Sequence, residues 1–157
     1  YFKTLNKNLD YLIISVGGGG LISGISSYVK QLSPNTKVIG VEPEGAKGMS
    51  DSIKLGKPLE NVSVNSIADS LSAPLHLEYS YNVAKSVIDE MVTVTDDEMK
   101  EFMIYAFNNL KLMLEPACVA GLAAIKYKIN DKLKNKNTLV ILCGSNIDKM
   151  TWTKLIA

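Results

Sequence analysis

Strand-like apolar runs alternate with helix-like segments along this chain. The apolar runs predict four strands, at residues 12–16, 37–41, 91–94 and 138–143. The segments between them predict helices at residues 21–31, 46–55, 76–88, 96–112 and 116–129, with a short helix after Asn146. Because the strands have almost no polar interruption, we expect a parallel sheet covered on both faces.

Several residues mark where these helices begin and end. Thr95 and Glu98 have the spacing of a capping box, so we expect a helix to begin directly after Thr95. Pro116 occupies a tolerated first-turn position of the helix predicted over residues 116–129. Gly56 is suited to end the helix predicted over residues 46–55. Residues 57–74 are polar and without clear period, and the lysine-rich residues 130–137 are predicted to form a solvated loop.

The alternation predicts one three-layer α/β domain over residues 1–157, with a mostly parallel sheet and flanking helices. In such sheets ligands bind beyond the carboxyl ends of the strands. Two informative loops are expected there. One is the glycine run 17–20 after Val16, and the other is the segment 143–146 after Leu142.

Chain length, net charge and cysteine count limit the classes of function that the chain can have. The 157 residues suffice for one domain, and a net charge of +1 gives no sign of a nucleic-acid or membrane partner. No apolar run is long enough to span a bilayer, and Cys118 and Cys143 form neither a disulfide framework nor a zinc-ligand spacing. We therefore expect a cytoplasmic protein. Since Tyr1 is not an initiator residue, we also expect a fragment of a larger catalytic domain.

The run of four glycines, Gly17, Gly18, Gly19 and Gly20, is the strongest chemical signal in the chain. A strand, a glycine loop and a helix N-terminus together leave backbone N–H groups unpaired, and the helix dipole adds positive potential. This arrangement predicts an anion site, with phosphate as the obvious occupant.

Three other interpretations of the glycine run remain open. A dinucleotide fingerprint would use Glu42 at the end of the next strand, but the glycine spacing is wrong. A P-loop would need Gly-Lys-Ser/Thr where the chain has Leu21-Ile22-Ser23. A purely structural turn is disfavoured because four adjacent glycines lose much conformational entropy on folding.

Six segments in order carry a resemblance that covers nearly the whole chain. They are the motifs Val-Gly-Gly-Gly-Gly-Leu-Ile-Ser-Gly at 16–24, Val-Ile-Gly-Val-Glu-Pro at 38–43, Ile-Ala-Asp-Ser-Leu at 67–71, Val-Thr-Val-Thr-Asp-Asp-Glu at 92–98, Glu-Pro-Ala at 115–117 and Cys-Gly-Ser-Asn-Ile-Asp at 143–148. This series resembles the C-terminal half of the catalytic domain of fold-type II pyridoxal-phosphate enzymes, and most of all threonine dehydratase and serine racemase.

The resemblance implies a role for each candidate residue. Gly17, Gly18, Gly19, Gly20 and Leu21 would hold the phosphate of pyridoxal 5'-phosphate. Cys143 would lie against the pyridine nitrogen, a place taken by Ser or Cys in the family. Glu115, Ser70, Ser145 and Asn146 would lie near the cofactor, although Glu115 could equally serve as a first-turn charge on the helix dipole.

The resemblance also implies a reaction. A neutral thiol cannot hold the pyridine nitrogen protonated as an aspartate would, so the ring is a weaker electron sink. This favours β-elimination over transamination. The expected parent reaction converts L-threonine or L-serine, small amino-acid substrates, into a 2-oxo acid and ammonia. The alternatives are serine racemisation and a non-catalytic phosphate-binding or assembly module.

The chain departs from the family pattern in ways that matter. No Ser-x-Lys-x-Arg-Gly-like segment is present, and Lys30, Lys47 and Lys54 match no Schiff-base motif, so no catalytic residue is assigned and the chain alone is expected to be inactive. Ser70 replaces the family's glycine.

Two further expectations concern metal and assembly. Glu42 and Ala46 match a cation site of some relatives, but Gly48 replaces its carboxylate, so no metal is assigned. His76, the single histidine, is expected to be a surface or capping residue. Missing strands would leave an open sheet edge, which makes a homo-oligomer a fair expectation.

Overall fold

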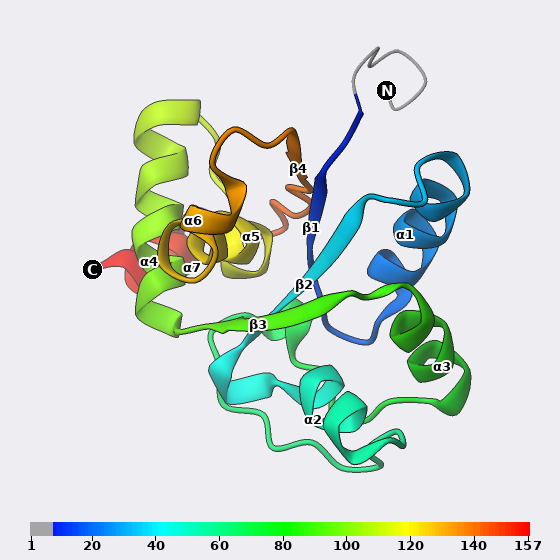
Figure 1. Cartoon of the computed structure of the whole chain (residues 1–157). Helices are drawn as coiled ribbons and strands as arrows, with labels where there is room; N and C mark the ends of the chain where they lie inside the picture. The colour runs from blue at the N-terminus through cyan, green and yellow to red at the C-terminus, as the bar shows by residue number, and fades with distance from the viewer. Residues whose placement is uncertain (1–7) are drawn as a thin grey trace.

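Four parallel strands form the sheet at the centre of the molecule, in a computed structural model that describes residues 8–157. The strands are β1 (Tyr11–Ser15), β2 (Lys37–Pro43), β3 (Glu90–Val94) and β4 (Thr138–Val140). Their order is β3-β2-β1-β4, and Figure 1 shows β3 crossing in front of β2. In the register of the sheet, Ile13 of β1 lies between Ile39 and Val140.

Helices cover both faces of this sheet (Figure 1). The α-helices are α1 (Gly20–Leu32), α2 (Gly48–Leu55), α3 (Glu78–Val87), α4 (Asp96–Tyr105), α5 (Pro116–Tyr127), α6 (Asn130–Leu133) and α7 (Lys149–Ile156). Three short turns complete the set: η1 (Glu44–Ala46), η2 (Asp69–Leu71) and the π-turn η3 (Ala106–Leu110). None of the helices in residues 8–157 has the length and apolar character to cross a membrane.

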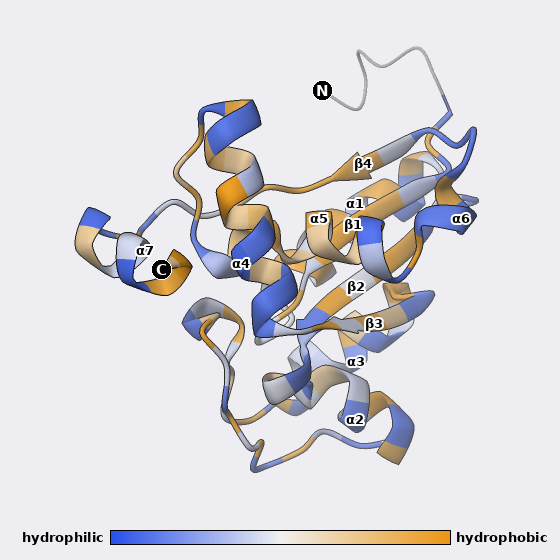
Figure 2. Ribbon diagram, turned by 90° about the vertical axis from the view of Figure 1, so that its left-hand side faces the viewer, coloured by the Kyte–Doolittle hydropathy of each residue, from blue (hydrophilic) through white to orange (hydrophobic). Residues whose placement is uncertain are grey.

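Alternating strand side chains separate the core into two clusters. Leu12, Ile14 and Val16 pack with α1 and α3 on one face. Ile13 packs with α4 and α5 on the other face, where Cys118 is also buried. Figure 2 shows β1 and β2 mostly in the colour of apolar residues, as expected for strands covered on both sides. The predicted three-layer α/β fold is confirmed.

Local differences from the sequence prediction occur at element ends. The helix predicted over 76–88 begins at Glu78, and the helix after Thr95 passes at Ala106 into a π-turn. The predicted loop 130–137 contains the single-turn helix α6, in which the Lys132 N–H donates to the carbonyl of Ile129 at 3.0 Å. The capping box is confirmed, since Thr95 and Glu98 bond reciprocally at 3.1 and 2.8 Å.

Strand β4 ends before the predicted Cys143. Its pairing continues for one bond, from the Ile141 N–H to the carbonyl of Ile13 at 3.0 Å. The chain then leaves the sheet and reaches Gly144, whose φ of 141° is not that of a regular strand. Cys143 thereby lies outside the sheet and lines the same cavity as Ser15 and Val16 at the end of β1.

His76 is buried, and its prediction as a surface or capping residue is wrong. Its side chain is 4% exposed, and its backbone N–H donates to the carbonyl of Leu59 at 2.8 Å. Its Nε2 lies so close to Gly48 that a Cβ there would approach it to 2.6 Å. Burial lowers the pKa of His76. The sequence predicted a helix from His76, whereas α3 begins at Glu78 and His76 belongs to the preceding loop, whose packing leaves no local sequence pattern.

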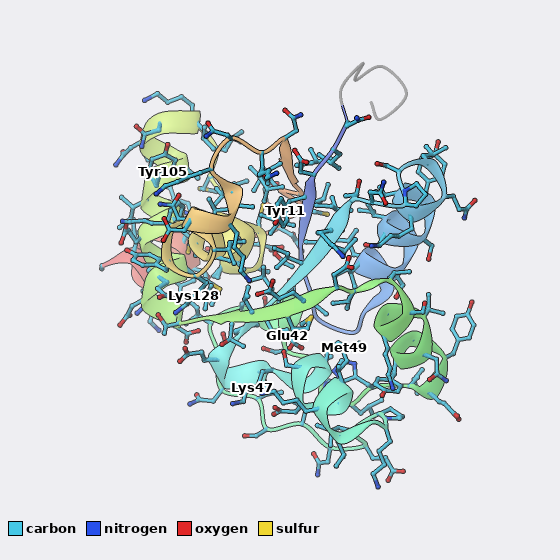
Figure 3. All side chains as sticks on the ribbon, in the orientation of Figure 1. Tyr11, Glu42, Lys47, Met49, Tyr105 and Lys128 are labelled. Atoms are coloured by element: carbon cyan, nitrogen blue, oxygen red, sulfur yellow. The ribbon has the colours of Figure 1, made fainter. Side chains whose placement is uncertain are left out.

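Glu42, at the carboxyl end of β2, joins the sheet to α2. Its buried carboxylate accepts the backbone N–H groups of Met49 and Ser50 at 2.7 and 2.9 Å and the Ser50 hydroxyl at 2.6 Å (Figure 3). Burial raises the pKa of Glu42, although these hydrogen bonds oppose the shift. A single carboxylate therefore satisfies the first turn of α2 while remaining 1% exposed.

Replacing Glu42 by Gln is expected to change how stability depends on pH. A carboxyl whose pKa is raised by folding contributes stability below its unfolded pKa of about 4.5. That contribution falls as the pH rises through the folded pKa. Glu42→Gln costs a hydrogen bond at every pH but has no such fall. Urea denaturation of variant and parent measures how much unfolding free energy the substitution costs. This loss should be smaller at pH 7 than at pH 4.

Glu60→Gln is the matched control, because Glu60 is exposed and has no side-chain hydrogen bond or ion pair within residues 8–157. An equal offset for Glu42→Gln at both pH values would contradict the raised pKa.

Candidate cofactor site

A cavity of about 230 Å³ lies at the carboxyl end of β1. One wall is the glycine loop, Gly17 to Gly20, with Leu21. The opposite walls come from Ser70 on η2, Ala117 on α5 and Cys143 after β4. Segments from four parts of the chain therefore meet at the sheet edge where parallel α/β folds bind ligands.

The glycine loop needs glycine at two positions for different reasons. Gly19 precedes α1 with a φ of 90°, a left-handed conformation that L side chains rarely adopt. Gly17 packs against the backbone of η2, and a Cβ on it would lie 2.8 Å from the carbonyl oxygen of Ser70 and 3.0 Å from the Cα of Leu71. By contrast, a Cβ on Gly18 would meet no atom within 4 Å.

The backbone N–H groups of residues 17–22 find no acceptor within residues 8–157. The first bond of α1 is donated by the Ser23 N–H to the carbonyl of Gly19 at 3.0 Å, and no side chain caps the helix. Its first turn also holds no acidic residue. The unpaired amides and the positive end of the helix dipole form an anion cradle.

Cys143 borders the cavity with its side chain exposed, while Cys118 is buried beneath it. Burial, with a smaller effect of Glu115 and Cys143, raises the pKa of Cys118 to about 11, so its thiol remains neutral. All side chains that line the cavity are uncharged. The positive potential for an anion therefore comes from backbone groups.

Glu115 lies behind the cavity wall, not on it. It is 9% exposed, and a Cβ on Gly144 would overlap its carboxylate. Burial raises the pKa of Glu115 most, the charge of Asp69 raises it further, and a hydrogen bond with Ser70 opposes them. Glu115 and Asn146 line a neighbouring pocket, and Ser145 lines neither.

The candidate cation position is built differently from a metal site. Both carboxylate oxygens of Glu42 are engaged by α2, and Gly48 is packed against His76 and Val62. Within residues 8–157 no three His, Cys, Asp or Glu side chains are grouped as metal ligands would be. The residues present do not fit a cation here.

Residues 1–144 match the family described as pyridoxal-phosphate dependent enzyme. The chain belongs to this family. Pyridoxal phosphate is the family's cofactor, and an anion cradle beside a neutral thiol fits its phosphate and pyridine nitrogen. The family match also removes the dinucleotide and P-loop interpretations of the glycine run.

Named relatives agree with this assignment. The chain is 44% identical over 146 residues to a phenylserine dehydratase of Ralstonia pickettii, covering 93% of this chain and 45% of the relative. It is 34% identical to a biosynthetic L-threonine dehydratase of Halalkalibacterium halodurans, covering 92% of this chain and 34% of the relative. The chain thus spans less than half the length of these two relatives.

Solved structures show the same fold. The processed form of threonine deaminase isoform 2 from Solanum lycopersicum superposes with a TM-score of 0.89 at 34% identity, covering 98% of this chain and 45% of that one. Serine racemase from Dictyostelium discoideum gives a TM-score of 0.81 at 36% identity, covering 90% and 45%. The resemblance to the threonine dehydratase and serine racemase group is confirmed.

The glycine loop, Ser70 and Cys143 are predicted from the sequence as site residues, and the structure places all of them on one cavity. Ser15, Leu71 and Ile141 also line the cavity but are not predicted as site residues. Their side-chain types carry no chemical signal. Their position follows from strand pairing and from the packing of η2.

Alanine at Gly17 is expected to destabilise the fold, whereas alanine at Gly18 is not. A Cβ on Gly17 must displace the backbone of η2, and such overpacking costs about 1–3 kcal/mol. Gly18→Ala is the matched control and should stay within about 0.5 kcal/mol. Urea denaturation of both variants measures the difference. Equal free energies of unfolding would contradict the close packing of Gly17 against η2.

Proposed function

We propose that this chain is part of the catalytic domain of a pyridoxal-phosphate-dependent enzyme that removes water from L-threonine or L-serine. The products would be a 2-oxo acid and ammonia. The observation that carries the proposal is the single cavity in which the unpaired amides of the glycine loop face Cys143. The dehydratases and deaminase among its relatives support the reaction class.

In this proposal the backbone amides of Gly17 to Leu21 hold the cofactor phosphate. They supply hydrogen-bond donors and helix-dipole potential without a charged side chain. Cys143, on the opposite wall, would hold the pyridine nitrogen. Ser70 lines the same cavity from η2, and its hydroxyl donates to the Asp69 carboxylate at 3.3 Å.

When bound, pyridoxal phosphate supplies an electron-withdrawing ring that acidifies the α-carbon of the amino acid. Cys143 would offer the ring nitrogen a weak hydrogen bond and no carboxylate, so it would not hold a full positive charge there. This wall would therefore suit elimination of water from a β-hydroxy amino acid better than transamination.

The proposal assigns the lysine that binds the cofactor aldehyde to another segment of the catalytic domain. No lysine lines the cavity in the described part of the chain. The chain is then one half of a site. An assembly role, in which it acts with a separate lysine-bearing chain, is the non-catalytic alternative.

A β-aryl substrate is a second candidate. The identity to phenylserine dehydratase is 44%, against 34% to the threonine dehydratase of Halalkalibacterium halodurans. An activity panel of L-serine, L-threonine and L-phenylserine, assayed with this chain joined to a lysine-bearing segment, distinguishes the substrates by 2-oxo acid release. D-serine formed without 2-oxo acid would instead support a racemase.

Binding of the cofactor to the purified chain tests the cradle directly. We expect pyridoxal phosphate to bind at least about tenfold more tightly than pyridoxal, because the phosphate accounts for the amide contacts. Hydrogen exchange should slow at the Gly17 to Leu21 amides when millimolar phosphate is added. No protection at these amides would contradict the cradle.

Borohydride reduction followed by peptide mass spectrometry tests the lysine assignment separately. We expect no stable adduct on one particular lysine. A reduced adduct confined to a single lysine would overturn the assignment of that residue to another segment, even if the cradle binds phosphate as proposed.

A further inference from the structure

The outer edge of β3 borders a second concave surface, away from the glycine cavity. A groove of about 560 Å³ runs along it and is lined by the successive residues 89–93. The remaining lining comes from α2, the end of α3 and Lys128 after α5. In the described part of the chain, β3 pairs with β2 alone. We call this surface the β3 groove.

Backbone hydrogen-bonding groups of β3 face this groove. The N–H of Lys37 and the carbonyl of Val41 are bonded to residues at the two ends of β1, so the even-numbered residues of β2 face β3. Gly40 is in register with Met91, and a residue in a parallel ladder bonds to the two residues that flank its register partner, here Glu90 and Val92. The N–H and C=O groups of Met91 and Thr93 are therefore turned outward. These outward groups have no partner within residues 8–157 and can pair with one more strand.

The groove carries an excess of unpaired positive charge. Lys47, Lys54 and Lys85 line it, are exposed, and form no ion pair within residues 8–157. Figure 3 shows Lys47 on one side of β3 and Lys128 on the other. Lys128 is paired with Glu98 at 2.8 Å.

The two carboxylates of the groove are neutralised from outside it. Asp89 is paired with Lys30 at 2.6 Å and with Lys37 at 3.2 Å. Glu90 is paired with Lys132. None of these three lysines lines the groove, so the groove lysines remain available to an incoming anionic partner.

Apolar side chains lie among these charges. Ile53, Ile88 and Met91 line the groove and are partly buried against the core. A strand presents alternate side chains to opposite faces. Because Lys54 and Lys85 lie on the same face as these apolar residues, over α2 and α3, a segment with alternating acidic and apolar residues would turn its carboxylates toward the lysines and its apolar side chains toward the opposite face.

We propose that the β3 groove binds an acidic, extended segment of a partner protein, which adds as a strand to the edge of the sheet. A second copy of this chain is a poorer occupant, because edge-to-edge pairing would bring the same lysines together. Lysines on an edge can also simply prevent strand pairing. Titration with an acidic peptide separates these cases.

The probe is a fluorescein-labelled peptide of alternating aspartate or glutamate and valine, seven residues long. Fluorescence anisotropy with the purified chain should show saturable binding that weakens as salt is raised. A peptide with lysine in place of every acidic residue should not bind. Absence of binding by the acidic peptide at low salt would overturn the proposal in favour of a protective edge.

Charge-reversal variants test the role of the groove lysines. Lys54→Glu combined with Lys85→Glu should weaken binding about tenfold or more, since two attractive pairs become repulsive. The matched control is Lys149→Glu with Lys154→Glu on α7, which changes the net charge equally on exposed lysines outside the groove. Equal weakening by both pairs would overturn a specific site.

A proline at an outward-facing amide tests strand addition itself. Thr93→Pro removes an outward N–H of β3 but leaves the bonds to β2 intact, whereas Thr93→Val keeps the N–H. Both variants lose the Thr93 hydroxyl, so only the backbone differs. We expect Thr93→Pro to weaken peptide binding about tenfold relative to Thr93→Val, with matched circular dichroism spectra showing that both fold. Equal binding would show adsorption by charge without an added strand and overturn the proposal.

Discussion

The close approach of Gly17 to the backbone of η2 is the constraint on which the cavity depends. A Cβ at this position would come within 3 Å of both the Ser70 carbonyl oxygen and the Leu71 Cα, and no flexible side chain is there to yield. The contact joins the end of β1 to a turn distant in the sequence. The glycines that leave the amides unpaired therefore also determine how near Ser70 lies to the loop.

The cavity would offer an anion the dipoles of backbone amides, because charged side chains lie behind its walls. Glu115 stands behind Gly144, and the cavity lining itself is neutral. Burial raises the pKa of Glu115 and of Glu42, because water no longer solvates either charge fully. In the proposed cofactor site a neutral lining would also suit the role of Cys143, since a nearby carboxylate would favour a protonated ring nitrogen.

Glu42 links the carboxyl end of β2 to α2, a helix that lines the β3 groove. By capping α2 from the end of β2, it fixes the helix that carries Lys54 and is preceded by Lys47. The same carboxylate is thereby committed to structure, which explains why the position does not resemble a cation site. The glycine cavity and the β3 groove lie on different parts of the sheet but share this framework.

Local sequence determined the fold class, the glycine loop and the capping box at Thr95, because strand runs, glycine conformations and caps depend on neighbouring residues. Motifs in a fixed order along the sequence also identified Cys143 and Ser70 as site residues. Tertiary structure decided the burial of His76, the withdrawal of Glu115 behind Gly144 and the gathering of lysines along β3. These depend on contacts between segments distant in the chain, for which no local period or spacing exists.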